Sequence, residues 1–365
     1  MEERFFYLCF SLVPGIGPKK FGLLLKNFKT AKTAWRASFA DLKHAGLSEG
    51  LIIKFEKVRS ELDIKNYLEN LKRKKVSFLA YCDREYPKLL KEIPNPPIVL
   101  FVKGNIKNIN FKKTIGIVGT RRITNYGREV TDIFSGELSA SGFTVVSGLA
   151  MGVDSEAAKS AIEAGGKTIA VLGNGVDICV PSINESLYDK ILDGNGIIVS
   201  EFPLGFSPTK GTFPSRNRII AGLSLGVLVT EGAKDSGSLI TADYAFKFTR
   251  KVFAIPGPIT SQLSVAPLKL IESGAKLVTS ANDICMELGV KRGKSEAKKI
   301  IKADTKEEQK IIDLLENESL HFDEIVRRLK FEPSFIGSIL SVLEIKGIIE
   351  SFEGGFYRLC KYESY

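Results

Sequence analysis

Six consecutive residues of this 365-residue chain, Phe213–Arg218 (FPSRNR), combine an aromatic ring, two arginines and an asparagine just ahead of an apolar stretch. Lys210 stands three residues upstream. Cations that follow a phosphate chain, beside a ring on which a base can stack, are what a single-stranded nucleic acid requires of a binding site. The pattern therefore indicates such a site, and a salt-bridged surface loop is the alternative that these residues alone leave open.

Two turns of small residues offer contacts to phosphate. Gly119–Arg121 follow the apolar run TIGIVG, and a Gly-Thr turn that opens a helix presents N–H groups while the arginine adds a planar donor fork. Ser236–Ser238 precede the helical pattern LITADYAF, and small residues at a helix N-terminus let a phosphate approach the backbone closely. A plain helix cap or a tight structural turn is the alternative at each position.

Two further turns carry weaker signals. Ser147 and Gly148 begin SGLAMGVD, in which Asp154 is able to cap or orient the loop. Residues 12–20 (LVPGIGPKK) join two predicted helices and resemble the helix–hairpin–helix motif, whose loop amides grip phosphate. Without that role the segment is a helix–helix turn.

Several kinds of site are disfavoured. The turn IGIVGTRRITNYG has one glycine where dinucleotide binding needs three, and AIEAGGKT leads into a strand instead of following one, so neither an NAD site nor a Walker loop is predicted. The two histidines, His44 and His321, and five cysteines without a CxxC pair predict no metal site, no cofactor and no catalytic triad. Odd, scattered cysteines and the lack of a signal peptide or a spanning apolar run predict a cytoplasmic protein without a membrane segment.

The positive charge is concentrated at the start of the chain. The net charge is +10, and residues 1–113 carry 23 Lys/Arg against 11 Asp/Glu. A field of that sign favours a polyanion such as nucleic acid, although a solvated lysine-rich surface explains the charge equally well.

The elements that must position these turns follow a βαβ rhythm after Thr114. Six short, nearly continuous apolar runs alternate with helix-length stretches: TIGIVG, FTVVSG, TIAVLG, GIIVSE, GVLVTE and KVFAIPG. Strands buried on both faces and separated by helices predict an α/β fold, a parallel sheet with helices on both faces. Ligands of such sheets bind at the carboxyl ends of the strands, where the turns described above lie.

The remaining segments complete a predicted order of five parts. Residues 1–75 read as a basic domain of short helices, and residues 76–110 as an extended, strand-bearing connector whose prolines exclude a helix. Residues 111–286 form the sheet domain, residues 287–305 a polar linker, and residues 306–365 three helices and a hairpin at Gly354-Gly355, which is a winged-helix pattern.

Eight motifs in one order, from VGTRRITNYG through FPSRNRIIAGLS and VTEGAKDSGSLITA to LIESGA, resemble the DNA-processing protein A family (DprA, also called Smf). The resemblance covers about 170 central residues. It implies a Rossmann-like single-stranded-DNA-binding domain, preceded by a helical (SAM- or helix–hairpin–helix-like) domain and followed by a winged helix. It also implies a protein of natural transformation that protects incoming DNA and loads the RecA recombinase, that forms a homodimer through the Rossmann-like domain, and that has no catalytic activity.

The resemblance places the DNA pocket on matched positions of this sequence. These are Gly119, Thr120, Arg121, Ser147, Gly148, Lys210, Phe213, Arg216, Asn217, Arg218, Ser236, Gly237 and Ser238. The chain departs from the family pattern at Ala158, where relatives commonly carry a histidine. That departure removes no cation from the pocket.

Two other functions fit parts of the chain. A nucleotide-processing, phosphoribohydrolase-like enzyme uses a related fold, and Glu201 and Glu231 are the carboxylates at strand ends that could serve as acid or base. The PGG-x-GT-x-x-E loop of such enzymes is missing, and an ion pair with an arginine or a capping role explains both residues. A transcription regulator would read DNA through the winged helix, but EPSFIGSILSVLEIKG has one lysine and two glutamates, which favours a protein-binding or structural role.

Overall fold

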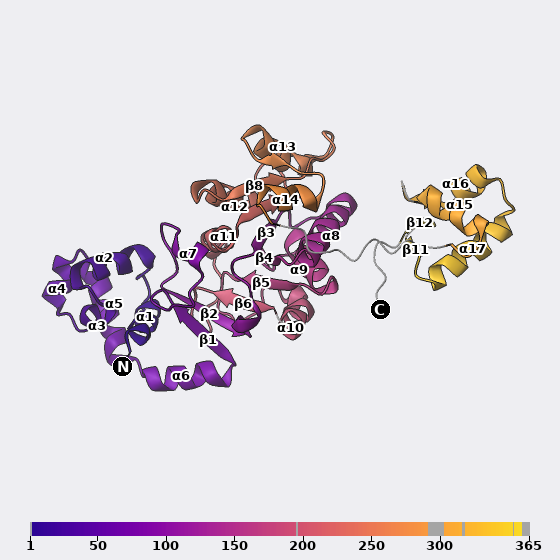
Figure 1. The fold of residues 1–365 in the computed structure, drawn as a ribbon. Coiled ribbons are helices and arrows are strands. Elements are labelled where there is room, and N and C mark those ends of the chain that lie inside the picture. Colours follow the sequence, from indigo (N-terminus) through magenta and orange to yellow (C-terminus); the bar gives the residue numbers. More distant parts are fainter. Residues whose placement is uncertain (1, 195, 291–302, 316–317, 353, 360–365) are drawn as a thin grey trace. The chain divides into compact units, whose positions relative to one another are not determined.

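The computed structural model describes residues 2–194, 196–290, 303–315, 318–352 and 354–359 (Figure 1). The chain forms two compact units, Met1–Ser295 and Glu296–Tyr365. Among the described residues, no helix has both the length and the apolar character that crossing a membrane requires.

A nine-stranded sheet organises the first unit, in the order β1-β2-β6-β5-β4-β3-β7-β8-β9. Strands β3 to β9 run parallel to one another, whereas β1 and β2 pair antiparallel to each other and β2 pairs antiparallel to β6. The strands are β1 (Val76–Ala80), β2 (Val99–Gly104), β3 (Thr114–Val118), β4 (Thr144–Ser147), β5 (Lys167–Val171), β6 (Ile197–Ser200), β7 (Gly226–Val229), β8 (Lys251–Ala254) and β9 (Lys276–Leu277). All six predicted strands are confirmed, as β3 to β8.

Helices cover both faces of this sheet, as the apolar runs predict (Figure 1). Helices α8, α9 and α14 pack with one set of strand residues, and α11, α12 and α13 pack with the alternate set. Their bounds are α8 (Asn125–Ala140), α9 (Val153–Glu163), α10 (Glu185–Asp193), α11 (Thr212–Leu223), α12 (Gly237–Lys247), α13 (Val265–Glu272) and α14 (Ala281–Glu287). Three short 3₁₀ turns lie at Ile106–Asn108, Ser182–Asn184 and Gln262–Ser264.

The N-terminal part consists of six helices that share a core with the sheet. Phe10, Trp35 and Phe55 pack ring against ring, and the same apolar cluster continues through Phe78 of β1 and Phe101 of β2. The helices are α1 (Glu3–Ser11), α2 (Pro18–Phe28), α3 (Ala31–Trp35), α4 (Phe39–His44), α5 (Glu49–Glu61) and α6 (Ile64–Arg73). The domain limits predicted at residues 75 and 110 stay predictions. The core described above contains residues from both sides of each limit.

Segment 76–110 differs from its prediction in one respect. It contributes strands β1 and β2, but its prolines do not exclude a helix, because α7 (Lys88–Lys91) forms one turn directly after Pro87. The fixed φ of proline suits the start of a helix and opposes only its interior.

The second unit is a winged helix, as predicted. Helices α15 (Lys306–Leu315), α16 (Phe322–Leu329) and α17 (Pro333–Ile345) bury one apolar cluster, and the strands β10 (Leu320–His321), β11 (Ile349–Phe352) and β12 (Phe356–Leu359) form a sheet in the order β10-β12-β11. The predicted linker, residues 287–305, lies mostly outside the described residues.

Strand β3 is the point at which the order of the parallel sheet reverses. The chain adds β4, β5 and β6 on one side of β3 and then returns to place β7 and β8 on the other side. Connections that diverge from neighbouring strands leave a crevice at their carboxyl ends, which is where open α/β sheets bind ligands.

Candidate nucleic-acid interface

Arg121 and Phe213 meet at this crevice, although they are 92 positions apart in the sequence. Arg121 ends the turn after β3, Phe213 is the second residue of α11, and the guanidinium lies 5.6 Å from the centre of the Phe213 ring. Arg121 is exposed and Phe213 half-buried, and no described carboxylate pairs with this arginine. A cation held over the edge of an accessible ring can contact a phosphate while the ring stacks on a base.

Arg216, three residues after Phe213, is 4 % exposed and close enough to Arg121 to feel its charge. Its guanidinium donates a hydrogen bond to the carbonyl of Val171 at the end of β5, and it lies beside the Asp154 carboxylate, which accepts a 3.0 Å hydrogen bond from the Gly148 N–H. Burial lowers the pKa of Arg216 to about 10, and burial likewise raises the pKa of Asp154. The predicted DNA contact of Arg216 is untested, but its observed contacts tie the ends of β4 and β5 to α11.

The turn after β3 is fixed from two sides. The Thr120 N–H donates to the backbone oxygen of Glu231, at 2.8 Å, and the Glu231 carboxylate accepts 2.6 Å and 3.0 Å hydrogen bonds from the hydroxyl and the N–H of Thr124. A Cβ atom on Gly119 would lie 2.6 Å from Val153, so only glycine fits there. The expectation that the Gly-Thr turn opens a helix with unbonded N–H groups is wrong, because the Thr120 N–H is bonded and α8 begins only at Asn125.

The turn before α12 follows β7, the strand that pairs with β3. Ser236 caps the helix by accepting from the Ser238 N–H, and the two hydroxyl oxygens lie 2.8 Å apart. Gly237 is exposed, with open space where a Cβ atom would stand. Its carbonyl accepts a 3.2 Å hydrogen bond from the side chain of Asn217, which joins α11 to α12.

The other predicted positions divide by their exposure. Ser147 is 1 % exposed and donates to the carbonyl of Ile117, so its hydroxyl stabilises the sheet. Lys210 is exposed on the loop before α11. Arg218 belongs to a different surface, since its guanidinium forms an ion pair with Glu201 and borders a groove that is lined by Lys19 and Tyr244.

The predicted residues divide into an exposed group and a buried group, and observed contacts join Arg121 to Phe213 and Asn217 to Gly237. Those that are exposed or half-buried are Gly119, Arg121, Lys210, Phe213, Asn217, Arg218, Ser236 and Gly237. The buried ones are Thr120, Ser147, Gly148, Arg216 and Ser238. Both carboxylates considered for an enzyme are engaged, Glu201 by Arg218 and Glu231 by Thr124.

Sequence reasoning missed the groove residues Tyr244 and Lys247 of α12 and Phe248, which follows its last residue. Their spacing was the available signal, because residues three and four apart share one face of a helix. Ala158, at the departure from the family pattern, is 2 % exposed and packs in the core shared with the N-terminal helices.

Comparison with known families matches most of the chain. Residues 77–289 match the family model described as DNA recombination-mediator protein A, and residues 295–355 match the DprA winged helix domain. Protein Smf of Synechocystis is 41 % identical over 292 residues, which cover 79 % of this chain and 73 % of that protein. DNA processing protein DprA of Bacillus subtilis is 42 % identical over 213 residues, which cover 58 % of this chain and 71 % of that protein.

Two solved structures share the fold. DNA processing protein A from Streptococcus pneumoniae aligns with a TM-score of 0.68 at 33 % identity, covering 79 % of this chain and 99 % of that one. DNA processing protein A from Helicobacter pylori, whose structure concerns its single-stranded DNA binding mode, aligns with a TM-score of 0.54 at 29 % identity, covering 60 % of this chain and 98 % of that one.

Proposed function

Because the chain belongs to the DNA recombination-mediator protein A family, whose relatives are named DprA or Smf, we propose that it binds single-stranded DNA at the crevice beside β3. The observation that carries the proposal is the exposed Arg121 guanidinium over the Phe213 ring. Arg121 contacts a phosphate, Phe213 stacks on a base, and Lys210 holds the next phosphate along the strand. The binding mode reported for the Helicobacter pylori relative supports this choice of ligand.

The cellular role follows from the same relationship. The protein coats strands that enter the cell in natural transformation and hands them to the RecA recombinase. It acts by binding and not by catalysis. The pairing of Glu201 with Arg218 and of Glu231 with Thr124 supports this reading, since both carboxylates already hold the fold.

Binding to single strands should far exceed binding to duplex DNA of the same length and salt concentration. Fluorescence anisotropy with a labelled 30-nucleotide strand and its duplex measures both affinities.

Arg121→Ala should weaken single-strand binding by roughly 1–3 kcal/mol, the range of charge-assisted hydrogen bonds. Phe213→Ala should cost a similar ~1–3 kcal/mol through lost stacking.

Arg122→Ala is the matched control, because Arg122 is also exposed but makes no described contact with the ring. Equal affinity for single and double strands, or equal losses from Arg121→Ala and Arg122→Ala, would contradict the proposed site. Nucleotides incubated with the same preparation should stay intact. Release of a base would favour the phosphoribohydrolase-like alternative.

The protein should be a homodimer through the domain that carries the sheet. Ile259 and Met286, which flank the last strands, are 90 % and 72 % exposed, and a self-association surface would cover such side chains. Light scattering should give twice the chain mass of 40.1 kDa. A mass of one chain throughout the micromolar range would refute the dimer.

A further inference from the structure

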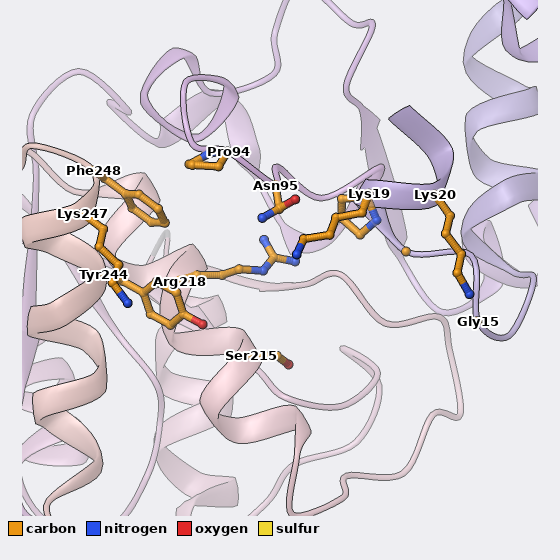
Figure 2. Close-up of a pocket in the computed structure, with 12 residues that line it drawn as sticks. Gly15, Lys19, Lys20, Pro94, Asn95, Ser215, Arg218, Tyr244, Lys247 and Phe248 are labelled. Carbon is orange, nitrogen blue, oxygen red and sulfur yellow. The ribbon is translucent and has the colours of Figure 1, made fainter. Parts of the chain in front are cut away.

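A groove separates the N-terminal helices from α11 and α12 (Figure 2). Its volume is about 720 Å³. One wall is formed by Gly15 of the turn before α2 and by Lys19 and Lys20 in the first turn of that helix. The other wall carries Arg218 and Lys247. The proposed function above makes no use of this groove.

The groove is strongly cationic. Lys19, Lys20, Arg218 and Lys247 line it, and none of its lining residues is an aspartate or a glutamate. No described carboxylate forms an ion pair with any of these three lysines. Figure 2 shows the side chains of Lys19 and Arg218 extending toward each other from opposite walls. Like charges that face one another across a groove are stabilised when an anion lies between them.

The backbone of the first wall suits a phosphate in particular. Helix α2 begins at Pro18, and its N-cap residue, Gly17, provides no side-chain cap. The positive end of the helix therefore faces the groove without a side-chain acceptor of its own. Gly15 has a φ of +95°, which favours glycine, and the absence of side chains at Gly15 and Gly17 lets a phosphate come close.

The second wall offers aromatic surface next to its cations. The rings of Tyr244 and Phe248 stack with centroids 5.7 Å apart, and the Lys247 amine lies 5.9 Å from the Tyr244 ring. Arg218 uses one nitrogen for the ion pair with Glu201, while its Nη1 atom is buried without a hydrogen-bond partner among the described residues. Cations alternating with rings are the pattern of a groove that follows a nucleic-acid strand.

We propose that this groove binds the sugar–phosphate backbone of the same DNA strand that the crevice holds, as a second contact region. The inference rests on the proposed function. Helix α11 links the two regions, since it carries Phe213 at the crevice and Arg218 at the groove. Five residues of helix separate them, which is about 7.5 Å along the axis. A strand leaving the crevice therefore reaches the groove within a few nucleotides.

The test uses the full chain with Lys19, Lys20 and Lys247 all changed to alanine. Its control changes three other exposed lysines of the helical part, Lys26, Lys54 and Lys57, which do not line the groove. Both variants lose the same charge. Affinities for 6-nucleotide and 30-nucleotide strands are measured at several salt concentrations, with thermal melting to confirm that both variants fold.

The groove variant should bind the 30-nucleotide strand about tenfold less tightly, and the slope of log affinity against log salt should shrink by about 2, close to 0.7 for each lost contact on a single strand. Binding of the 6-nucleotide strand should weaken less than binding of the 30-nucleotide strand, because fewer of its phosphates reach the groove. Normal affinity and slope for the long strand would overturn the inference, as would equal losses in the two triple variants. If the groove instead binds an acidic protein segment, the groove variant should bind the long strand with normal affinity and a normal salt slope.

The two proposals fail in distinguishable ways. If Arg121→Ala weakens binding but the groove variant does not, the groove inference is wrong and the crevice proposal stands. If the wild-type protein shows no preference for single strands, the proposed function itself is wrong.

Discussion

Replacing Arg216 by methionine is expected to lower the free energy of unfolding by roughly 1–3 kcal/mol, the cost of leaving buried polar groups without their partners. Methionine keeps much of the volume but leaves the Asp154 carboxylate buried without its cation. The Val171 carbonyl loses its donor as well. Urea unfolding of the variant and the wild type measures the difference. A further change of Asp154 to asparagine should restore part of the loss.

The deficit of this variant should depend on pH in a defined direction. Burial already raises the pKa of Asp154, and removing Arg216 raises that pKa further. A carboxyl group whose pKa is raised on folding contributes stability below its unfolded pKa of ~3.9 and loses it as the pH rises through the folded pKa. The difference from wild type should therefore be smallest in acid and largest at neutral pH. The control, Arg121→Ala, changes an exposed arginine and should alter the free energy of unfolding by less than ~0.5 kcal/mol. A similar loss from both variants would show that Arg216 does not stabilise the fold.

Two glycines of the predicted site should respond in opposite ways to a single methyl group. In Gly148→Ala the new Cβ atom would overlap the Arg216 guanidinium, so that side chain must shift and its hydrogen bond to the Val171 carbonyl is disturbed. We expect a loss of about 1–3 kcal/mol from overpacking. In Gly237→Ala the methyl group enters open space at the first position of α12, and stability should stay equal or rise by about 0.5–1 kcal/mol.

The effect of Gly237→Ala on single-strand binding is a second, independent prediction. The Gly237→Ala protein should be as stable as wild type yet bind the strand more weakly by roughly 1 kcal/mol, because the methyl group stands where a phosphate approaches the helix N-terminus. Chemical unfolding and anisotropy on the same samples provide both values. Unchanged affinity would place the strand away from α12, and an unaffected Gly148→Ala protein would show that Arg216 can be accommodated elsewhere.

Much of the fold could be predicted because its signals are local. Each strand from β3 to β8 is a short apolar run between turns, and each is buried as that pattern requires. The antiparallel edge was harder. Strands β1 and β2 are separated by the proline-rich segment 81–98, and β2 pairs with β6 far along the chain, a register that no local pattern records. No local pattern predicts that the N-terminal helices share a core with the sheet, because the contacting residues are far apart in the chain.

The residue types of the site could be predicted from the sequence, but the direction in which each side chain points could not always be. Arg121, Lys210 and Phe213 are exposed or half-buried at the strand ends, where their positions after predicted strands would put them. Arg216 and Arg218 looked equivalent in the motif FPSRNR. Helix periodicity does not separate them, because Arg216 precedes the buried Ile219 and Ile220 by three and four residues, and Arg218 likewise precedes the buried Ala221 and Gly222. The partners that hold Arg216 come from other strands and could not be read from the motif.

The antiparallel edge also dictates when the fold can be completed during synthesis. Strand β2 ends at Gly104, but its second neighbour, β6, begins only at Ile197. Ribosomes add ~5–20 residues per second, so roughly 5–20 s pass between the appearance of the two strands. Until β6 appears, β2 has no partner on its second edge, and an unpaired strand edge invites pairing with another chain. The nascent protein is therefore most exposed to misassociation before β6 appears, and shielding by a chaperone would matter most then.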